Sequence, residues 1–379
     1  MKSPVRLMHF LSIPGVLFAA AMFSNAHDGL SNAASGMVVT AAADQADTDS
    51  SEGKISGQGE YRFRVLHTRE FLPQEAVAVL EKAHGGFAVD RREGKGEVYF
   101  ALPGAGIIRL SRDLKTAGLL PTPEEVKAPN LHNTTIWFGE GDQARLVFPA
   151  NDIGKVFTTT LEGELLNVLD APTGETRFDH QEVSEYFKKG EKFAPTDVEY
   201  MNRMYYVTTG YSPLDYVLTA RTEGSSVSAQ WNGLAFGGKG DGKGQFQTGH
   251  GITVSADGDY LDIADRPVAE IERFSPEGKY LSTVKLPEGA WPCDIDYTEG
   301  LACVPCLYGP DHSKGAPVYL MQEGKIISTI MPKEELGLEK FQHIHNAVLT
   351  RYEDKLYLIV QAWNPGDFAI LEQVVDGGE

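Results

Sequence analysis

The chain of 379 residues has little cysteine, a deficit of basic residues and no long uninterrupted apolar run. It has 34 Lys and Arg against 53 Asp and Glu, a formal net charge of -19. This balance argues against binding to nucleic acid or to an anionic membrane surface, because both need basic patches. What remains is ordinary for a globular protein: 42% hydrophobic and 10% aromatic residues supply an ample core.

The N-terminus is typical of an export signal. Lys2 and Arg6 precede an apolar run, and Ser24-Asn25-Ala26 matches a small-residue cleavage site. A histidine and a proline interrupt the run, which is short for a span of about 20 residues. We therefore expect a signal peptide over 1–26, no membrane span after cleavage, and a periplasmic or secreted protein. Residues 27–60, rich in Ala, Ser, Gly and Asp, are predicted to be a disordered linker.

A pattern that recurs from residue 61 onward predicts the fold. A polar residue, often histidine, precedes a short apolar strand, a turn and a second strand. The pattern starts six times, at His84, His132, Pro195, His250, Pro292 and His345. The intervals between these starts fit blades of about 40 to 50 residues with loop insertions. We predict an all-β, six-bladed β-propeller over residues 61–379.

The last blade lacks a strand, because only three fit after His345. The alternating segment 61–66 (YRFRVL) has no blade of its own. We expect it to supply the missing outer strand and close the ring, which removes exposed sheet edges. An open solenoid is the competing architecture, and it leaves both the orphan strand and the short blade unexplained.

Histidines occupy four of the six pattern starts. In a propeller the first strand of each blade is innermost, so residues at its start crowd the axis. His132, His250 and His345 lie on alternate blades, about 120° apart in a six-fold ring. Three converging imidazoles with an open fourth position are typical of a catalytic divalent metal site, most simply zinc. His84 is a further candidate ligand or tunnel-lining residue, and His343 is a weaker one. Alternatively, each imidazole only satisfies hydrogen bonds at the tunnel mouth.

Two stretches carry a family resemblance. GQFQTGHGITV with YLDIADRPVAEIERFSPEGKY resembles an NHL-type blade and, more narrowly, a blade of peptidyl-alpha-hydroxyglycine alpha-amidating lyases. PTDVEY with YYVTTGY resembles the third blade of that family. The resemblance implies zinc-binding roles for His132, His250 and His345. It also implies that Tyr211 is the catalytic tyrosine and Arg266 one of two active-site arginines.

The chain departs from that family at two places. Residues 101–106 (ALPGAG) contain no counterpart of the second arginine. Asn346 stands where the family has an aspartate ligand of an axial calcium ion, although its amide oxygen could still bind calcium. We therefore expect amidating-lyase activity to be weak or redirected to another substrate.

The chemistry of such a site can be stated from the residue types. A metal ion held by three histidines polarises a bound oxygen and lowers its pKa toward 7. The Tyr211 phenol can act as a general base, and the Arg266 fork suits a substrate carboxylate. Less specific alternatives are a rim aromatic for Tyr211 and a surface ion pair of Arg266 with Asp215 or Glu270.

Two functions follow from this reasoning. The first is a metal-dependent lyase that acts on an alpha-hydroxy amide or a similar small, carboxylate-bearing molecule or peptide. The second is a non-catalytic NHL propeller that binds a protein or glycan in the cell envelope. The histidines on alternate blades favour the lyase, because a pure binding scaffold has no need of them.

The three cysteines are an odd number, which in an exported protein leaves a free thiol or an intermolecular link. A turn at residues 298–300 would place Cys293 opposite Cys306 on paired strands, so this pair is the candidate disulfide. Cys303 is expected to be buried. Cys293 also lies near the axial mouth, where its sulfur is a further candidate metal ligand.

Overall fold

The structure of the chain is a computed structural model that describes residues 53–223 and 226–375. The expected signal peptide over 1–26 and the expected linker up to residue 52 lie outside the described residues. No helix within the described residues combines the length and the apolar character needed to cross a membrane.

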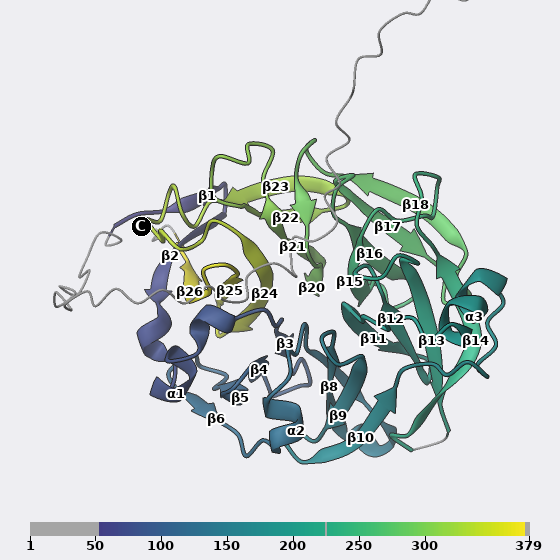
Figure 1. The fold of residues 1–379 in the computed structure, drawn as a ribbon. Helices are drawn as coiled ribbons and strands as arrows, with labels where there is room; N and C mark the ends of the chain where they lie inside the picture. Colours follow the sequence, from purple (N-terminus) through teal and green to yellow (C-terminus); the bar gives the residue numbers. More distant parts are fainter. Residues whose placement is uncertain (1–52, 224–225, 376–379) are drawn as a thin grey trace, which may run out of the picture. The chain divides into compact units, whose positions relative to one another are not determined.

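Six antiparallel sheets arranged around a centre form a β-propeller, which confirms the predicted fold (Figure 1). Blade one contains β3 (Ala88–Val89), β4 (Val98–Leu102), β5 (Gly106–Leu110) and β6 (Ala117–Leu119). Blade two contains β7 (Thr135–Phe138), β8 (Ala144–Ala150), β9 (Lys155–Thr159) and β10 (Leu165–Asp170). Blade three contains β11 (Asp197–Met201), β12 (Met204–Thr208), β13 (Tyr216–Thr222) and β14 (Ala229–Gly237).

The remaining blades follow the same order along the chain. Blade four contains β15 (Gly249–Val254), β16 (Leu261–Asp265), β17 (Glu270–Phe274) and β18 (Tyr280–Lys285). In blade five the innermost strand is split into β19 (Trp291–Pro292) and β20 (Asp296–Thr298), followed by β21 (Leu301–Tyr308), β22 (Val318–Gln322) and β23 (Lys325–Ile330). Blade six contains β24 (Ile344–Tyr352), β25 (Lys355–Ala362) and β26 (Asp367–Gln373).

Short helices lie in the connections between these strands. They are η1 (Arg69–Phe71), α1 (Gln74–Val77), η2 (Leu80–Lys82), α2 (Glu124–Lys127), η3 (Glu140–Asp142) and α3 (Gln181–Lys188). Glycine makes the tight turns inside blade four. Gly258 and Gly278 have φ of 80° and 79°, a conformation that side chains with a Cβ rarely adopt.

Apolar residues of neighbouring blades pack against each other and form the core. One cluster joins Tyr99 and Ala101 of blade one to Leu146 and Phe148 of blade two. Because both faces of each sheet are covered in this way, the second strands are mostly buried, and every residue of β16 is buried. Each blade therefore holds its innermost strand, and the residues at its start, in a fixed position.

The N-terminal segment closes the ring as predicted, because β2 (Tyr61–His67) pairs with β26 as the outer strand of blade six. Phe63 of β2 is fully buried in the core between blades five and six. The closing segment starts earlier than the sequence analysis expected. Residues assigned to the linker form β1 (Ser56–Gln58), which pairs with β2. β1 also reaches blade five, since Gln58 N donates to Ser328 Oγ at 2.9 Å.

Candidate functional site

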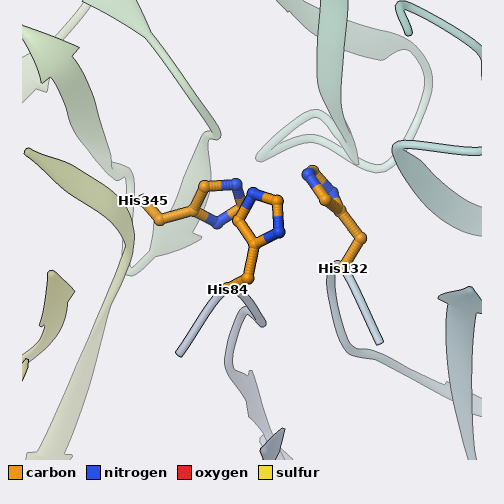
Figure 2. A group of neighbouring side chains, drawn as sticks. All are labelled: His84, His132 and His345. Atoms are coloured by element: carbon orange, nitrogen blue, oxygen red, sulfur yellow. The ribbon is translucent and has the colours of Figure 1, made fainter. Parts of the chain in front are cut away.

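Four buried histidines meet at the centre of the ring. They come from blades one, two, four and six. The ring centroids of His84, His132 and His345 are 4.4 to 4.7 Å apart, and Figure 2 shows these three side chains pointing toward one another. The centroid of His250 lies 4.7 Å from that of His132 and 5.1 Å from that of His345. The four imidazoles therefore form one cluster.

A β-bulge surrounds each histidine that lies on an alternate blade. The register between β15 and β16 shifts around His250, and that between β24 and β25 shifts around His345. In blade two the bridge at Leu131 and the ladder from Thr135 are offset by one residue, around His132. A bulge bends its strand and re-aims a side chain, and bulges are common beside active sites. The same irregularity recurs where three blades present a histidine.

Hydrogen bonds fix the tautomer of these three histidines. Each places Nδ1 against a backbone carbonyl of the next blade: His132 on Thr196 (2.6 Å), His250 on Cys293 (2.7 Å) and His345 on Gly85 (3.3 Å). A carbonyl only accepts, so Nδ1 donates and Nε2 of the neutral ring keeps a lone pair. Metal-binding histidines are held in the same way by outer partners. The three residues therefore fit a metal ion that Nε2 atoms would bind.

His84 has the opposite hydrogen-bond pattern. Its Nδ1 lies 2.8 Å from the Asn130 side-chain nitrogen, which also donates to Asn151 at 2.9 Å. Because an amide nitrogen only donates, Nδ1 of His84 accepts, and the proton of the neutral ring is on Nε2. That proton occupies the nitrogen that would otherwise face a metal ion.

Distance alone selects a different set of three. Nitrogen atoms of His84, His132 and His345 lie within 4.8 Å of one another, and this buried cluster could hold a metal ion. The sequence analysis expected His250 in place of His84. His250 is not part of this set of three. In the structure its Nε2 accepts a hydrogen bond from Arg266 Nη2 at 2.5 Å. His343, the weaker candidate, is half-buried outside the cluster, with Nδ1 on the Leu307 carbonyl at 3.2 Å.

The structure brings Tyr211 and Arg266 together beside these histidines. The Tyr211 hydroxyl lies 3.1 Å from His132 Nε2 and 3.0 Å from His250 Nε2. Arg266 Nη1 donates to the same hydroxyl at 2.9 Å. Tyr211 follows β12 and Arg266 follows β16, the second strands of blades three and four. Their side chains therefore meet on the face where His250 begins its strand.

Arg266 is buried, with 5% of its surface exposed, which excludes the alternative of a surface ion pair. Asp215 instead faces Lys239 at 3.6 Å, and Glu270 faces Lys285 at 2.8 Å. Within the described residues no carboxylate lies within ion-pair distance of Arg266. A buried guanidinium without an acidic partner is costly to keep.

Burial also sets the protonation states around the cluster. It lowers the pKa of both His250 and His345 well below the ordinary value, and neighbouring cationic groups lower both further. Both imidazoles are therefore neutral at neutral pH, the form that binds metal ions. Burial raises the pKa of Tyr211, and the adjacent Arg266 acts in the opposite direction.

The candidate disulfide between Cys293 and Cys306 is not formed, and all three cysteines are buried free thiols. A shift of register in β19 places Pro292 opposite Cys306, while Cys293 N bonds to the Pro305 carbonyl. The two sulfurs consequently diverge. Cys306 packs in the core of blades four and five, whereas Cys293 Sγ lies 3.3 Å from Arg266 Nη2.

A polar layer follows the histidines along the inner strands. It contains Asn133, Asp197, Asp294 and Asn346. The Asn346 amide nitrogen donates to Asp294, and its oxygen accepts from Phe87 N at 3.0 Å. The oxygen that calcium would need therefore already accepts one hydrogen bond from the backbone. Burial raises the pKa of Asp294 to about 7.

A group of aromatic residues that the sequence analysis did not assign to the site lies near the cluster: Trp291, which was expected in core or rim packing, Tyr308 and His312. Trp363 also lies beside the cluster, and its ring is stacked on that of His84 with centroids 5.7 Å apart. A signal for the others was present. Tyr308 is the last residue of the second strand of blade five, and Arg266 is the first residue after the second strand of blade four.

No protein-family model and no curated protein matches the sequence. Solved propellers are similar at low identity. Virginiamycin B lyase from Staphylococcus aureus is 14% identical, with 77% of this chain and 96% of that chain covered and a TM-score of 0.45. A streptogramin B lyase is 12% identical (87% and 90% covered, TM-score 0.46). A chain of a nidogen/laminin complex is 12% identical (74% and 94%, TM-score 0.47). No function is carried over from these likenesses.

Proposed function

We propose that His132, His250 and His345 bind a divalent transition metal ion, most simply zinc, and that the protein is a lyase of alpha-hydroxy amides. The hydrogen-bond pattern carries this proposal. Of the four clustered histidines, only these three combine a bulge, an Nδ1 bond to the next blade and an Nε2 lone pair. The lone pair of His250 accepts from Arg266 Nη2 at 2.5 Å, so Arg266 would have to turn away for the metal to bind there. The sequence resemblance to the amidating lyases supports the same assignment.

The residues around the histidines suit the cleavage of R–CO–NH–CH(OH)–COO⁻ into an amide and glyoxylate. When bound, the metal would lower the pKa of the substrate hydroxyl. Burial disfavours the Tyr211 phenolate, but the positive charges of Arg266 and of the bound metal would favour it. The phenolate would then take the hydroxyl proton, the oxygen forms the aldehyde, and the C–N bond breaks. The nitrogen keeps the electron pair of that bond and receives from Tyr211 the proton that was taken from the hydroxyl. Arg266 holds the carboxylate and, through Nη1, stabilises the Tyr211 oxygen.

Metal content separates the two sets of histidines. We expect His250→Ala to lose most of the bound metal, as His132→Ala and His345→Ala would, while His84→Ala keeps it. Each purified variant is measured by inductively coupled plasma mass spectrometry, with circular dichroism as the check of folding. If His84→Ala loses the metal and His250→Ala retains it, the ligand set proposed here is wrong.

The reaction is tested by release of glyoxylate from an N-acyl-alpha-hydroxyglycine. We expect turnover by the metal-loaded wild-type protein and none by the triple histidine variant. Because no second arginine is present in 101–106, the rate should be low. A wild-type protein that holds the metal but cleaves no alpha-hydroxy amide would instead favour the non-catalytic binding propeller.

A further inference from the structure

Five aromatic side chains form a continuous row on blades five and six: Trp291, Tyr308, His312, His343 and Trp363. Tyr308 is its centre. Its ring centroid lies 5.1 Å from Trp291, 4.6 Å from His312 and 4.8 Å from His343. His343 in turn lies 6.0 Å from Trp363. We call this group the aromatic row.

The aromatic row is continuous with the histidine cluster. Trp363 stacks on His84 with ring centroids 5.7 Å apart, and His84 touches His132 and His345. Tyr308 and Trp363 come from the ends of β21 and β25, on the same face as Arg266. Tyr211 belongs to blade three and Arg266 to blade four, while the aromatic row lies on blades five and six. A molecule held by Arg266 can therefore extend from the cluster over the row.

The members of the row are left partly exposed. Trp291, Tyr308, His343 and Trp363 are half-buried, and His312 is exposed. Large aromatic rings contribute most to stability when they are fully buried. A contiguous group of partly exposed rings beside a polar cluster is therefore better suited to contact a ligand than to stabilise the blades.

The ring geometry favours an aromatic ligand over a sugar. Tyr308 meets Trp291 and His343 at 84° and 75°, an edge-to-face packing that a further aromatic ring can extend. A sugar ring needs an open flat face. One face of Tyr308 is already covered by His312, which is stacked at 26°, and one face of Trp363 is covered by His84.

We propose that the aromatic row is a subsite for an aromatic ring on the acyl side of the substrate. The preferred substrate is then an N-aroyl-alpha-hydroxyglycine, with its carboxylate at Arg266 and its ring against Tyr308. This inference rests on the proposed function for the position of the reacting group. Binding of an aromatic ring to the aromatic row does not depend on the lyase reaction, so it can be tested separately with compounds that do not react.

The binding test uses two compounds that cannot react because they lack the hydroxyl group. N-benzoylglycine and N-acetylglycine share the carboxylate and differ in the ring. In calorimetry on the metal-loaded protein, we expect N-benzoylglycine to bind about 10-fold or more tightly than N-acetylglycine. Tyr308→Ala should bring the ratio of the two affinities close to one. Phe138→Ala is the matched control: Phe138 is an exposed aromatic at the far end of β7, and the ratio should remain.

Equal affinity of the wild-type protein for the two compounds, or no binding of N-benzoylglycine at millimolar concentration, overturns the subsite. A ratio that survives Tyr308→Ala in a folded variant overturns it as well. Turnover distinguishes the two proposals. If N-benzoyl-alpha-hydroxyglycine is not cleaved but the Tyr308-dependent binding preference is present, the lyase assignment fails and the subsite stands. If both the N-benzoyl and N-acetyl substrates are cleaved with equal kcat/KM, the subsite fails and the lyase stands.

Discussion

Arg266 is the residue whose placement is hardest to explain by stability. Its guanidinium is buried among a phenol, a thiol and an imidazole, with no acidic partner among the described residues. We expect Arg266→Met to raise the free energy of unfolding by about 1 kcal/mol, because a buried charge is removed while the volume is kept. Chemical denaturation measures this change.

The same variant should lose activity. Loss of a charge-assisted hydrogen bond to a substrate carboxylate corresponds to about a 10- to 100-fold fall in kcat/KM, mainly through KM. A variant that is both less stable and fully active would mean that Arg266 serves the fold. Arg273→Met is a useful comparison, because Arg273 pairs with Asp262 at 2.7 Å, and its loss should lower stability instead.

Tyr211 can be tested by removing a single oxygen. Tyr211→Phe keeps the ring beside His132 but deletes the hydroxyl that lies near two Nε2 atoms. We expect turnover to fall by about 10²- to 10⁴-fold, the range for loss of a general base. Metal content should not change, because Tyr211 is not a ligand. Parallel loss of metal and activity would show that the hydroxyl positions the histidines.

At the residue scale, the sequence indicated which side chains gather but not how they are held. Tyr211 and Arg266 could be placed because each follows a second strand. The tautomers could not be predicted, since they depend on carbonyls of the next blade, such as Thr196 for His132. The contact between His84 and Asn130 is a tertiary contact of the same kind.

At the scale of single elements, the bulges explain why the regular alternation of side-chain direction along the inner strands does not predict where the histidines point. An inner strand in strict alternation would fix the direction of each side chain, and one extra residue changes it. The shift in β19 has a similar origin and separated the cysteines that seemed opposed in sequence. Strand existence could be predicted from apolar runs, whereas register at the strand start could not.

β17 contains a buried acid that should make stability depend on pH. Glu272 is 2% exposed, and one of its carboxylate oxygens has no hydrogen-bond partner. Burial raises its pKa to about 7, and Asp265 and Glu270 act in the same direction. The folded state therefore keeps a proton that the unfolded state releases at about pH 4.5. Its contribution to stability is lost as pH rises from about 4.5 to 7.

Glu272→Gln removes this titration. We expect the variant to gain stability relative to the wild type as pH rises from 5 to 8, by on the order of 2 kcal/mol. Urea denaturation at several pH values measures the difference. Glu277→Gln, an exposed position in the same blade, controls for the loss of one negative charge. A difference between wild type and Glu272→Gln that is constant with pH would contradict the assignment.

At the scale of the whole molecule, the fold was the most predictable property. Six recurrences of one pattern specify six blades, and the shortage of strands after His345 indicates where the N-terminal segment must pair. β1 was not foreseen because Ser56–Gln58 has the polar composition of a linker. Its pairing depends on contacts with blade five, including the bond from Met331 N to Ser56 Oγ at 2.7 Å. These contacts join segments far apart in sequence.

The closure of the ring can be tested at Phe63, the fully buried residue of β2. Its side chain packs among apolar residues of blades five and six, so it joins the first strand of the propeller to its last blades. We expect Phe63→Ala to lower the free energy of unfolding by about 3 to 5 kcal/mol through lost burial and the cavity left behind. Leu281→Ala, at a position 39% exposed on the outer strand of blade four, should change it by less than about 0.5 kcal/mol. Urea denaturation followed by circular dichroism gives both values.

If the closing strand is essential for the ring, amide protons of β24 and β25 should lose protection from exchange in Phe63→Ala before those of β12 and β13. Equal loss of protection in all blades would show that the ring unfolds as one unit and that closure stabilises every blade alike.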